Sequence, residues 1–427
     1  METIDKLILG AGFAGLGAAH SFSQKGYKSV ILEKESTYGG LCGNFIIDGF
    51  RFDRFVHLSF SKDETVNALL KVDSVDVLKH SSNPFNLYKG IWIKHPAQNN
   101  LYPLSDDEKQ KVITDFLNRP KVFGEINNYE EWLRLQFGNY FAEHFPMVYT
   151  RKYWMCEAKE LETKWVGSRF YQPSVEEVIQ GANTSDTPIT YYAKEMRYPA
   201  KGGYSHFVKD LAEAADIRYN EEIVEINSED RVLSCKNGNS YKYNNIFSSL
   251  PLPEIIKLLN NTPRNVIDAA GMLRYTSGYH ISIGLKTKNI PPYLWWYIYD
   301  EDILPARVYS PSLKSPDNVP TGCSSLQMEL FCKKEQYSET EMYNGSVQKL
   351  IDLDIIKEED ILFVHYGFEK YANVTFNHNI YKSREIIRTY LDSIDIYTIG
   401  RFGEWDYLWS DQSLLSGIRI ADKFNNI

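Results

Sequence analysis

The sequence lacks features that would place it in several common classes. It has no run approaching about 18 apolar residues, so we predict no membrane-spanning helix. Its 47 lysines and arginines are outnumbered by 56 aspartates and glutamates, which argues against nucleic acid as a partner. Its five cysteines form no CxxC pair and no metal-ligand spacing with histidine, so we predict free thiols and no metal. With no secretory signal at the start, this cysteine usage favours a cytoplasmic location.

The composition is that of a folded protein rich in aromatic residues. The 427 residues are 43% hydrophobic and 24% charged, which is typical of soluble globular chains. At about 150 residues per domain, the length predicts two or three domains. The 30 tyrosines, 22 phenylalanines and 8 tryptophans suit a polyol or ring-shaped ligand, although a large core is the simpler explanation.

A nucleotide-binding motif begins near the N-terminus. Residues 4–9 predict a short buried strand, which leads into the motif GAGFAG and a helix of small residues. In such a motif Gly10 permits the tight turn, Gly12 lets the backbone approach a pyrophosphate, and Gly15 lets helix and strand pack closely. Glu33, at the end of the second strand, is placed to accept the hydroxyls of an adenosine ribose. The sequence therefore predicts a dinucleotide cofactor.

A second glycine-rich segment, YGGLCGN at 38–44, follows Glu33 closely. It indicates that Gly39, Gly40 and Leu41 contact another part of a long cofactor, such as a ribityl chain and flavin. A glycine-rich surface turn is the alternative. The doublet resembles that of the FAD-dependent amine oxidase and mutase superfamily, and this resemblance favours FAD held within the chain over exchangeable NAD.

The remaining segments predict a discontinuous α/β protein. Residues 105–160 have helical spacing, whereas 275–333 contains β-branched and aromatic runs typical of an antiparallel sheet. Apolar runs at 244–253 and 395–400 predict strands that return to the first sheet, and the last segment predicts a helix. The predicted parts are a Rossmann-type FAD-binding domain at 1–60, 200–275 and 390–427, a mainly helical substrate or lid domain at 61–200, and an antiparallel β-sheet substrate domain at 276–389.

Five further segments occur in one order, each with the internal spacing of a known motif. They are FDRFVHLSF at 52–60, HPAQNN at 95–100, YTRKYW with ELETKWVGSRF at 149–170, LWWYIYDEDILPARVYSPS at 294–312 and GRFGEWDYLWSDQS at 400–413. Together they resemble the UDP-galactopyranose mutase family, in its longer eukaryotic-type branch, within the amine oxidase and protoporphyrinogen oxidase-like superfamily. The resemblance extends over nearly the whole chain.

This resemblance implies roles for individual residues. His57 would lie beside the flavin, where a pKa near neutrality would suit it to sense or relay flavin protonation. Arg169 and Arg307 would bind the substrate diphosphate, because a guanidinium bonds phosphate oxygens through its planar fork and stays charged. The implied substrate-binding residues are Gln98, Thr150, Tyr297, Tyr371 and Tyr407, and the further cofactor-binding residues are Gly400, Arg401 and Gln412.

Several positions differ from the family pattern. Phe55 and Val56 stand where the histidine loop has two glycines. His95 and Ala97 stand where the base-binding motif has aromatic residues, and Thr150 replaces an asparagine that contacts the sugar. The sugar and the base therefore stay open, and a 6-deoxy or amino sugar on UDP or another nucleotide is an alternative to galactose.

The resemblance implies a nucleotide-sugar mutase, in which N5 of reduced FAD attacks the anomeric carbon and the pyranose and furanose forms interconvert. A reductant such as NAD(P)H would keep the flavin reduced, and galactofuranose for polysaccharide biosynthesis would be the default product. One alternative is an FAD-dependent oxidoreductase of the amine oxidase or protoporphyrinogen oxidase-like type, in which Arg169 and Arg307 would have no obvious role. Another is a flavin-binding protein without catalysis. The sequence does not fix the oligomeric state.

Overall fold

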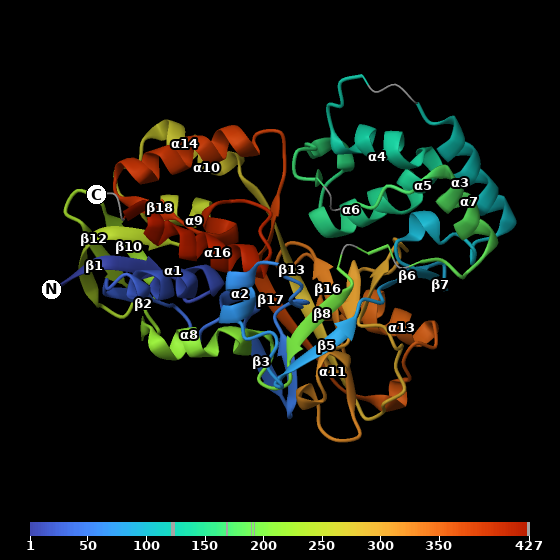
Figure 1. Ribbon diagram of the computed structural model, residues 1–427, viewed down its shortest axis with the longest axis horizontal. Helices are drawn as coiled ribbons and strands as arrows, with labels where there is room; N and C mark the ends of the chain where they lie inside the picture. The colour runs from blue at the N-terminus through green and yellow to red at the C-terminus, as the bar shows by residue number, and fades with distance from the viewer. Residues whose placement is uncertain (121–123, 168–169, 189, 192, 425–427) are drawn as a thin grey trace.

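The computed structural model is built around two seven-stranded sheets, with a separate group of helices beside them (Figure 1). The first sheet lies at the left of this view, and the second lies near its centre. The described residues are 1–120, 124–167, 170–188, 190–191 and 193–424.

The first sheet is a parallel sheet with an antiparallel extension at one edge. Its strand order is β10–β11–β12–β1–β2–β9, and β18 pairs with β12 beside this path. In the middle of the sheet, Ile8 lies between Ile31 and Phe247, and all three side chains are fully buried because helices cover both faces. The strands are β1 (Glu2–Leu9), β2 (Ser29–Leu32), β9 (Asp216–Arg218), β10 (Ile223–Asn227), β11 (Val232–Cys235), β12 (Ser240–Ser248) and β18 (Ile396–Thr398).

The predicted return of two distant strands to this sheet is confirmed, since β12 and β18 are both part of it. Helix α1 (Phe13–Gln24) packs closely on α16 (Ser410–Ile420), the predicted C-terminal helix. A Cβ atom added at Gly417 would lie 1.9 Å from the carbonyl oxygen of Ala14, so glycine permits this approach. The other helices of this part are α8 (Lys209–Ala214), α9 (Leu252–Leu258), α10 (Arg264–Met272), α14 (Ile380–Ser393) and α15 (Gly400–Gly403).

The second sheet has the strand order β17–β13–β16–β15–β14–β6–β7. It is antiparallel, as predicted for 275–333, except that β14 and β6 pair in parallel. Strands β6 and β7 belong to the range 61–200 that we predicted to be mainly helical. The strands are β6 (Phe85–Tyr88), β7 (Ile91–Lys94), β13 (Arg274–Leu285), β14 (Trp295–Ile298), β15 (Arg307–Tyr309), β16 (Ser324–Phe331) and β17 (Ile361–Thr375).

The helices between residues 106 and 183 form the group at the upper right of Figure 1. Ser105, Asn128 and Ser174 each precede a helix and accept a backbone N–H of its first turn, which fixes where α3, α4 and α7 begin. These helices are α3 (Asp106–Asn118), α4 (Tyr129–Phe137), α5 (Asn139–His144), α6 (Pro146–Trp154) and α7 (Val175–Asn183).

Two strand pairs and several short helices complete the fold. Strand β3 pairs with β4, and β5 pairs with the distant β8. Their bounds, with those of the short helices, are β3 (Asn44–Ile47), β4 (Phe50–Asp53), β5 (Val77–Ser81), β8 (Glu195–Pro199), α2 (Glu64–Leu69), α11 (Pro311–Lys314), α12 (Glu339–Met342) and α13 (Gln348–Asp352).

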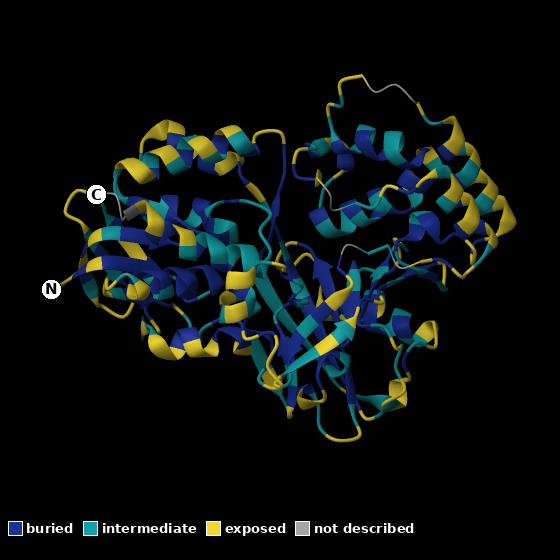
Figure 2. Cartoon of the chain, viewed as in Figure 1, coloured by how far each residue is buried: buried dark blue, intermediate teal, exposed yellow. Residues whose placement is uncertain are grey.

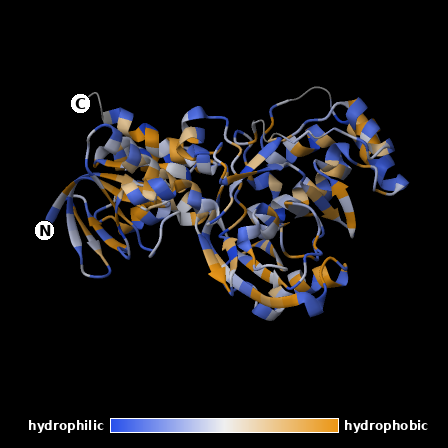
Figure 3. Ribbon diagram, turned by 60° about the horizontal axis from the view of Figure 1, so that its bottom comes forward, coloured by the Kyte–Doolittle hydropathy of each residue, from blue (hydrophilic) through white to orange (hydrophobic). Residues whose placement is uncertain are grey.

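Burial follows this architecture. The strands of both sheets are mostly buried, and the exposed residues concentrate on the outward faces of the peripheral helices (Figure 2). Figure 3 shows the corresponding pattern of hydropathy, with hydrophobic residues along the strands and hydrophilic residues on the outer helices. Within the described ranges, no helix combines the length and apolar character needed to cross a bilayer.

Candidate active site

One large cavity is bordered by both sheets and by helices α4 to α6. Its volume is about 1790 Å³, whereas a pocket for one small ligand has roughly 300–1,000 Å³. The cavity therefore has room for a dinucleotide and a second ligand. The predicted residues that line it are Gly10, Gly12, Glu33, Gly39, Gly40, Leu41, His57, Gln98, Thr150, Tyr297, Arg307, Tyr371, Gly400, Arg401 and Tyr407.

The glycine motif forms a tight turn between β1 and α1. Gly10 has φ +94°, a conformation that side-chain-bearing residues rarely adopt. A Cβ atom at Gly15 would lie 2.0 Å from the carbonyl oxygen of Gly10, so that helix and strand meet without room for a methyl group. At Gly12, by contrast, a Cβ atom would meet no protein atom within 4 Å, because this position opens into the cavity.

The residues of this turn fit the pyrophosphate and ribose of a dinucleotide. No side chain caps α1 and its first turn carries no acidic residue, so its N-terminal amides face the cavity without competition. The Glu33 carboxylate accepts the amides of Ala11 at 2.7 Å and Glu35 at 3.0 Å, one on each oxygen. Each oxygen keeps a second lone pair for a ribose hydroxyl.

The second glycine segment packs directly against the first. The Gly39 amide donates to the carbonyl of Ala11 at 2.9 Å, and a Cβ atom at Gly40 would lie 3.4 Å from the Cα of Gly12. Gly39 has φ +107° and Gly40 has φ +56°, so both use the conformational freedom of glycine. The segment therefore extends the same cavity wall and is not a detached surface turn.

His57 lies in the cavity wall as a neutral imidazole. Its Nδ1 lies 3.0 Å from the carbonyl oxygen of Phe55, so Nδ1 carries the proton and Nε2 is an acceptor. Its ring stacks on Tyr204 with the centroids 5.2 Å apart. Burial is the main cause that lowers the pKa of His57 to about 4. Our prediction of a pKa near neutrality was wrong, because sequence alone does not reveal this burial.

The loop before His57 keeps an unusual backbone despite its larger side chains. Phe55 has φ +151°, outside the range that residues with a Cβ atom normally occupy. The Val56 amide donates to Oε1 of Glu329 at 2.9 Å. The surrounding contacts thus hold a conformation for which glycine would be the ordinary choice.

Arg307 reaches the cavity from β15, but it is paired with a buried carboxylate. Its Nε and Nη2 donate to Oε2 of Glu329 at 2.9 and 2.5 Å, and Glu329 is fully buried. Burial alone would lower the pKa of Arg307, but the Glu329 charge outweighs it and the pKa lies well above its ordinary value. Among the described residues, Nη1 has no hydrogen-bond partner, and this nitrogen is the one available to a ligand.

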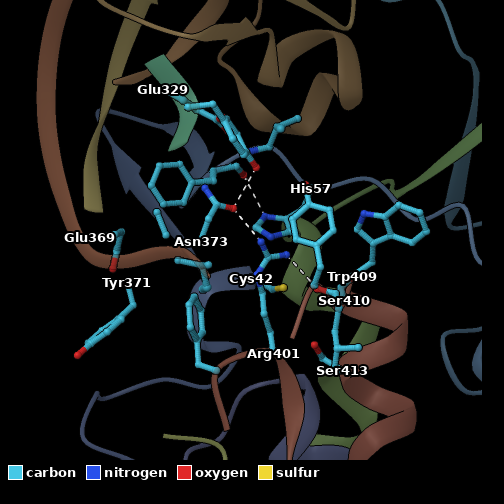
Figure 4. A pocket seen from close by; sticks show the side chains of 18 of the residues that line it. Cys42, His57, Glu329, Glu369, Tyr371, Asn373, Arg401, Trp409, Ser410 and Ser413 are labelled. Carbon is cyan, nitrogen blue, oxygen red and sulfur yellow. Dashed lines mark hydrogen bonds between the residues drawn. The ribbon is translucent and has the colours of Figure 1, made fainter. Parts of the chain in front are cut away.

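Arg401 is held by neutral groups. Its Nη1 donates to the carbonyl of Leu408 at 2.9 Å, and its Nη2 donates to Oδ1 of Asn373 at 2.8 Å. The hydroxyl of Tyr153 donates to the same Asn373 oxygen at 3.0 Å, and the guanidinium lies 4.9 Å from the centroid of Tyr407. Figure 4 shows the Arg401 side chain directed toward His57 and Asn373. Its charge is thus not offset by a carboxylate within the described part of the chain.

Three predicted substrate-binding residues have polar groups already engaged by the protein. The Tyr371 hydroxyl donates to Glu254 at 2.5 Å, and Figure 4 shows it turned away from Arg401. The amide nitrogen of Gln98 donates to the Tyr171 carbonyl at 2.8 Å. The hydroxyl of Thr150 donates to the Pro146 carbonyl at 2.7 Å, one turn earlier in α6. In this conformation Thr150 offers a ligand only lone pairs and Tyr371 only lone pairs or ring surface, whereas Gln98 keeps one N–H donor beside the lone pairs of its oxygen.

Two other predicted residues, Gly15 and Gln412, lie apart from the cavity lining. Gly15 faces the Gly10 carbonyl, as described above. Gln412 turns its side-chain oxygen back to accept the Trp409 amide at 2.9 Å, which caps α16. Arg169 lies outside the described residues.

Sequence reasoning missed the partners of the two arginines. Glu329 belongs to the strand segment SSLQMELF, where Ser325, Gln327 and Glu329 alternate with apolar residues. In a buried strand, such an alternation predicts that one face of the strand places polar side chains along a cavity. Asn373 has no comparable signal, because a lone asparagine in a strand usually indicates nothing more than an exposed position.

The first part of the chain matches a family model described as an NAD(P)-binding Rossmann-like domain, over residues 8–71. An all-trans-retinol 13,14-reductase from Danio rerio is 30% identical over 145 residues, which cover 31% of this chain and 22% of the reductase. The chain spans about a fifth of the length of the first curated relatives that it matches.

Solved structures of several proteins resemble the whole chain. Reduced UDP-galactopyranose mutase has a TM-score of 0.93 at 23% identity, covering 99% of this chain and 96% of that chain. A putative protoporphyrinogen oxidase from Exiguobacterium sp. 255-15 has a TM-score of 0.76 at 15% identity, covering 99% and 98%. At such identities the likeness establishes the fold alone.

The glycine turn, the parallel sheet and the family match define a protein with a dinucleotide-binding Rossmann-like domain. Its overall architecture, α/β with a second, largely antiparallel sheet, is that of UDP-galactopyranose mutase. The predicted fold class is therefore confirmed.

Proposed function

We propose that the protein is a flavin-dependent nucleotide-sugar mutase that interconverts pyranose and furanose forms. One observation carries the proposal: a single cavity runs from the glycine turn, which suits FAD, to a wall of arginines and tyrosines, which suits a nucleoside diphosphate sugar. The overlap with the fold of reduced UDP-galactopyranose mutase supports it. When bound and reduced, FAD supplies the nucleophile for this chemistry.

Among the parts of the substrate, the diphosphate is the one that the side chains of the cavity wall are best suited to bind. We assign its binding to Nη1 of Arg307 and the hydroxyl of Tyr297, both in the cavity wall. Because Glu329 orients the Arg307 guanidinium before ligand arrives, stabilisation of the departing diphosphate requires little reorganisation. Arg169 remains the proposed second cation, on the resemblance alone.

Other side chains orient the ligands and exclude water. Arg401 is assigned to the cofactor and Tyr407 to the diphosphate beside it. His57 holds its proton on Nδ1 and presents Nε2 as an acceptor, so in this state it can orient a donor but not protonate a leaving group. Phe141, Phe145 and Tyr149 contribute an aromatic wall that keeps water from the activated sugar.

The proposal is tested with dithionite-reduced, FAD-loaded protein and a panel of nucleoside diphosphate sugars, beginning with UDP-galactose. Chromatography should show conversion between pyranose and furanose with no net consumption of electrons, and oxidised protein should be inactive. Arg307→Lys, which keeps the charge but loses the fork, serves as the matched variant and should be strongly impaired while retaining FAD. NAD(P)H should replace dithionite as the proposed reductant. Failure of every nucleotide sugar to react would contradict the proposal.

A second candidate is an FAD-dependent oxidoreductase of the amine oxidase or protoporphyrinogen oxidase-like type. The partial match to a retinol reductase and the structural likeness to a putative protoporphyrinogen oxidase favour it. Oxidised protein supplied with an artificial electron acceptor separates the two. An oxidoreductase consumes acceptor in proportion to product, whereas a mutase consumes none.

A further inference from the structure

Helix α6 and strand β14 pack against each other through rings that line the cavity. The ring of Tyr149 lies 5.4 Å from that of Tyr297, measured between centroids, in an edge-to-face arrangement. Phe145, just before α6, lies 5.1 Å from Tyr299, just after β14. All four residues line the cavity. The position of α6 against β14 therefore sets the shape of this part of the cavity.

A lysine on α6 joins this helix to the end of β14. Nζ of Lys152 donates to the carbonyl oxygens of Ile298 at 3.0 Å and Asp300 at 2.9 Å. Ile298 is the last residue of β14, so these carbonyls lie where the strand ends. Backbone oxygens away from water need a donor, and a charged donor forms the stronger bond. Lys152 follows Tyr149 by three residues, so both side chains leave the helix on the same side.

The loop that Lys152 holds connects the two residues that we assign to the diphosphate. Residues 299–306 lead from β14, which carries Tyr297, to β15, which begins at Arg307. The Asp300 carboxylate also accepts the amide of Lys89, in the turn between β6 and β7, at 2.7 Å. The start of this loop is therefore fixed by bonds from α6 and from the second sheet.

The neighbouring Arg151 binds the same loop in a more exposed place. Its Nε donates to Oε1 of Glu301 at 3.0 Å. The side chains of Arg151 and Glu301 are 34% and 65% exposed, so water competes with this ion pair and its contribution is small. Arg151 thus provides a matched comparison for Lys152, with the same charge on the same helix and a contact to the same loop.

The surroundings of Lys152 make its charge sensitive to pH. Burial lowers the pKa of Lys152 to about 7, although the acidic residues of the loop oppose this shift. Above this pH the amine is neutral, and its bonds to the two carbonyls weaken because a neutral donor replaces a charged one. The charged groups near it are Asp300, Glu301 and Asp302 in the loop, Lys349 bonded to Asp302, Lys89 beside Asp300, Glu108 bonded to Lys89, and Arg151 on α6.

We propose that Lys152 is a positioning residue for the substrate, which holds α6 against the end of β14 and so keeps the rings of the two elements at the spacing that a nucleoside diphosphate sugar requires. Lys152 is not part of the cavity lining, so it acts through Tyr149 and the loop at 299–306. This inference rests on the proposed function, because it assumes that such a ligand enters the cavity.

The experiment measures binding of the same panel of nucleotide sugars, beginning with UDP-galactose, to oxidised, FAD-loaded protein by calorimetry. Lys152→Met has a similar length but no donor, and at pH 6.5 it should bind about tenfold more weakly with its flavin content unchanged. Lys152→Arg restores a charged donor and should recover most of the affinity. Arg151→Met is the control and should change the affinity by less than about twofold.

The pH dependence separates a positioning role from a merely structural one. The diphosphate of a nucleotide sugar keeps its charge between pH 6.5 and 8.5. Over this range the affinity of the unaltered protein should fall by about three- to tenfold, as Lys152 loses its proton. In Lys152→Arg the guanidinium stays charged, so the affinity should vary by less than about twofold.

Three results would overturn this inference and leave the mutase proposal standing. They are full affinity in Lys152→Met, equal weakening in Lys152→Met and Arg151→Met, and the same pH profile in Lys152→Arg as in the unaltered protein. If Lys152→Met does not fold, the profile of Lys152→Arg still decides. If no nucleotide sugar binds to the unaltered protein, the mutase proposal fails as well.

Discussion

The two ends of the cavity are built in different ways. The cofactor end is made of backbone, at glycines that either leave space or adopt a positive φ, such as Gly12, Gly39 and Gly400. Another part of the lining is a wall of side chains, which includes Arg307 and Arg401. A backbone cradle is fixed by the fold itself, whereas a side-chain wall needs partners that hold each charge in place.

Those partners give the two arginines different electrostatic roles. Arg307 faces a buried carboxylate, so the pair has no net charge, and what it offers a ligand is an oriented donor. Arg401 is held by an amide and a carbonyl, so its positive charge is not cancelled by its partners. Of these two arginines, it is therefore Arg401 that keeps a charge able to attract an anion, a difference that the sequence alone does not show.

The largest expected effect follows the removal of one member of the charge pair. Arg307→Ala leaves Glu329 buried without its counter-charge, so the free energy of unfolding should fall by about 3–5 kcal/mol. Urea unfolding of the protein measures this. The double variant Arg307→Ala/Glu329→Gln removes the stranded charge and should regain most of the stability but not nucleotide binding. Equal stability of the two variants would show that Glu329 is not charged.

At the backbone end, two neighbouring glycines should respond in opposite ways. Gly15→Ala places a methyl group against the Gly10 carbonyl and should destabilise the apoprotein by about 1–3 kcal/mol. Gly12→Ala meets no protein atom and should leave that stability unchanged while lowering FAD occupancy, read from the flavin-to-protein absorbance ratio. Gly124→Ala, at an exposed glycine with open space around it, is the control and should change neither quantity. Full FAD occupancy in Gly12→Ala would show that the pyrophosphate does not lie against Gly12.

The third effect is a pH dependence that originates at His57. Its pKa is about 4 in the folded protein, and the ordinary value is 6.5, so between these values the unfolded chain binds a proton that the folded protein does not. Stability should therefore fall as the pH is lowered from 6.5 toward 4, by up to about 1.4 kcal/mol per pH unit from this residue. His57→Asn keeps a donor for the Phe55 carbonyl and should reduce the slope by this share, while His95 and His280, whose pKa values burial lowers to about 3, maintain the rest. An unchanged slope would contradict the burial of a neutral imidazole.

The smallest effect separates helix capping from cofactor binding. Gln412→Ala removes the acceptor for the Trp409 amide and should cost about 0.5–1 kcal/mol in thermal or urea unfolding. FAD occupancy should not change, because Gln412 does not line the cavity. A clear loss of FAD occupancy in a variant that stays folded would instead support the cofactor-binding role that the resemblance implies for Gln412.

These contrasts also explain which features could be predicted. The glycine turn, Glu33 and the first strands could be predicted because they lie close together in the sequence. Binding of a dinucleotide depends on these residues at a fixed spacing, which the sequence shows directly. The return of β12 and β18 was predictable from apolar runs of strand length. The fold class followed from these segments in combination.

The arrangement of the side-chain wall was not predictable in the same way. Glu329 meets Arg307 only because β15 and β16 pair in one register, and a sequence does not state its register. The lowered pKa of His57 depends on burial, and its ring stacks on Tyr204, a residue far from it in the sequence. Likewise, β6 belongs to the second sheet because it pairs in parallel with the distant β14, although it lies in the range 61–200 that we predicted to be mainly helical.

One carboxylate on β16 has a consequence for how this protein can change. Glu329 holds the Val56 amide with one oxygen and the Arg307 guanidinium with the other, so the histidine loop and the ligand wall share a single anchor. A shift in the backbone of the loop therefore affects the carboxylate that holds Arg307, and the reverse holds as well. Substitutions that change specificity in these two segments should show coupled effects, not independent ones, whether they arise in evolution or by engineering.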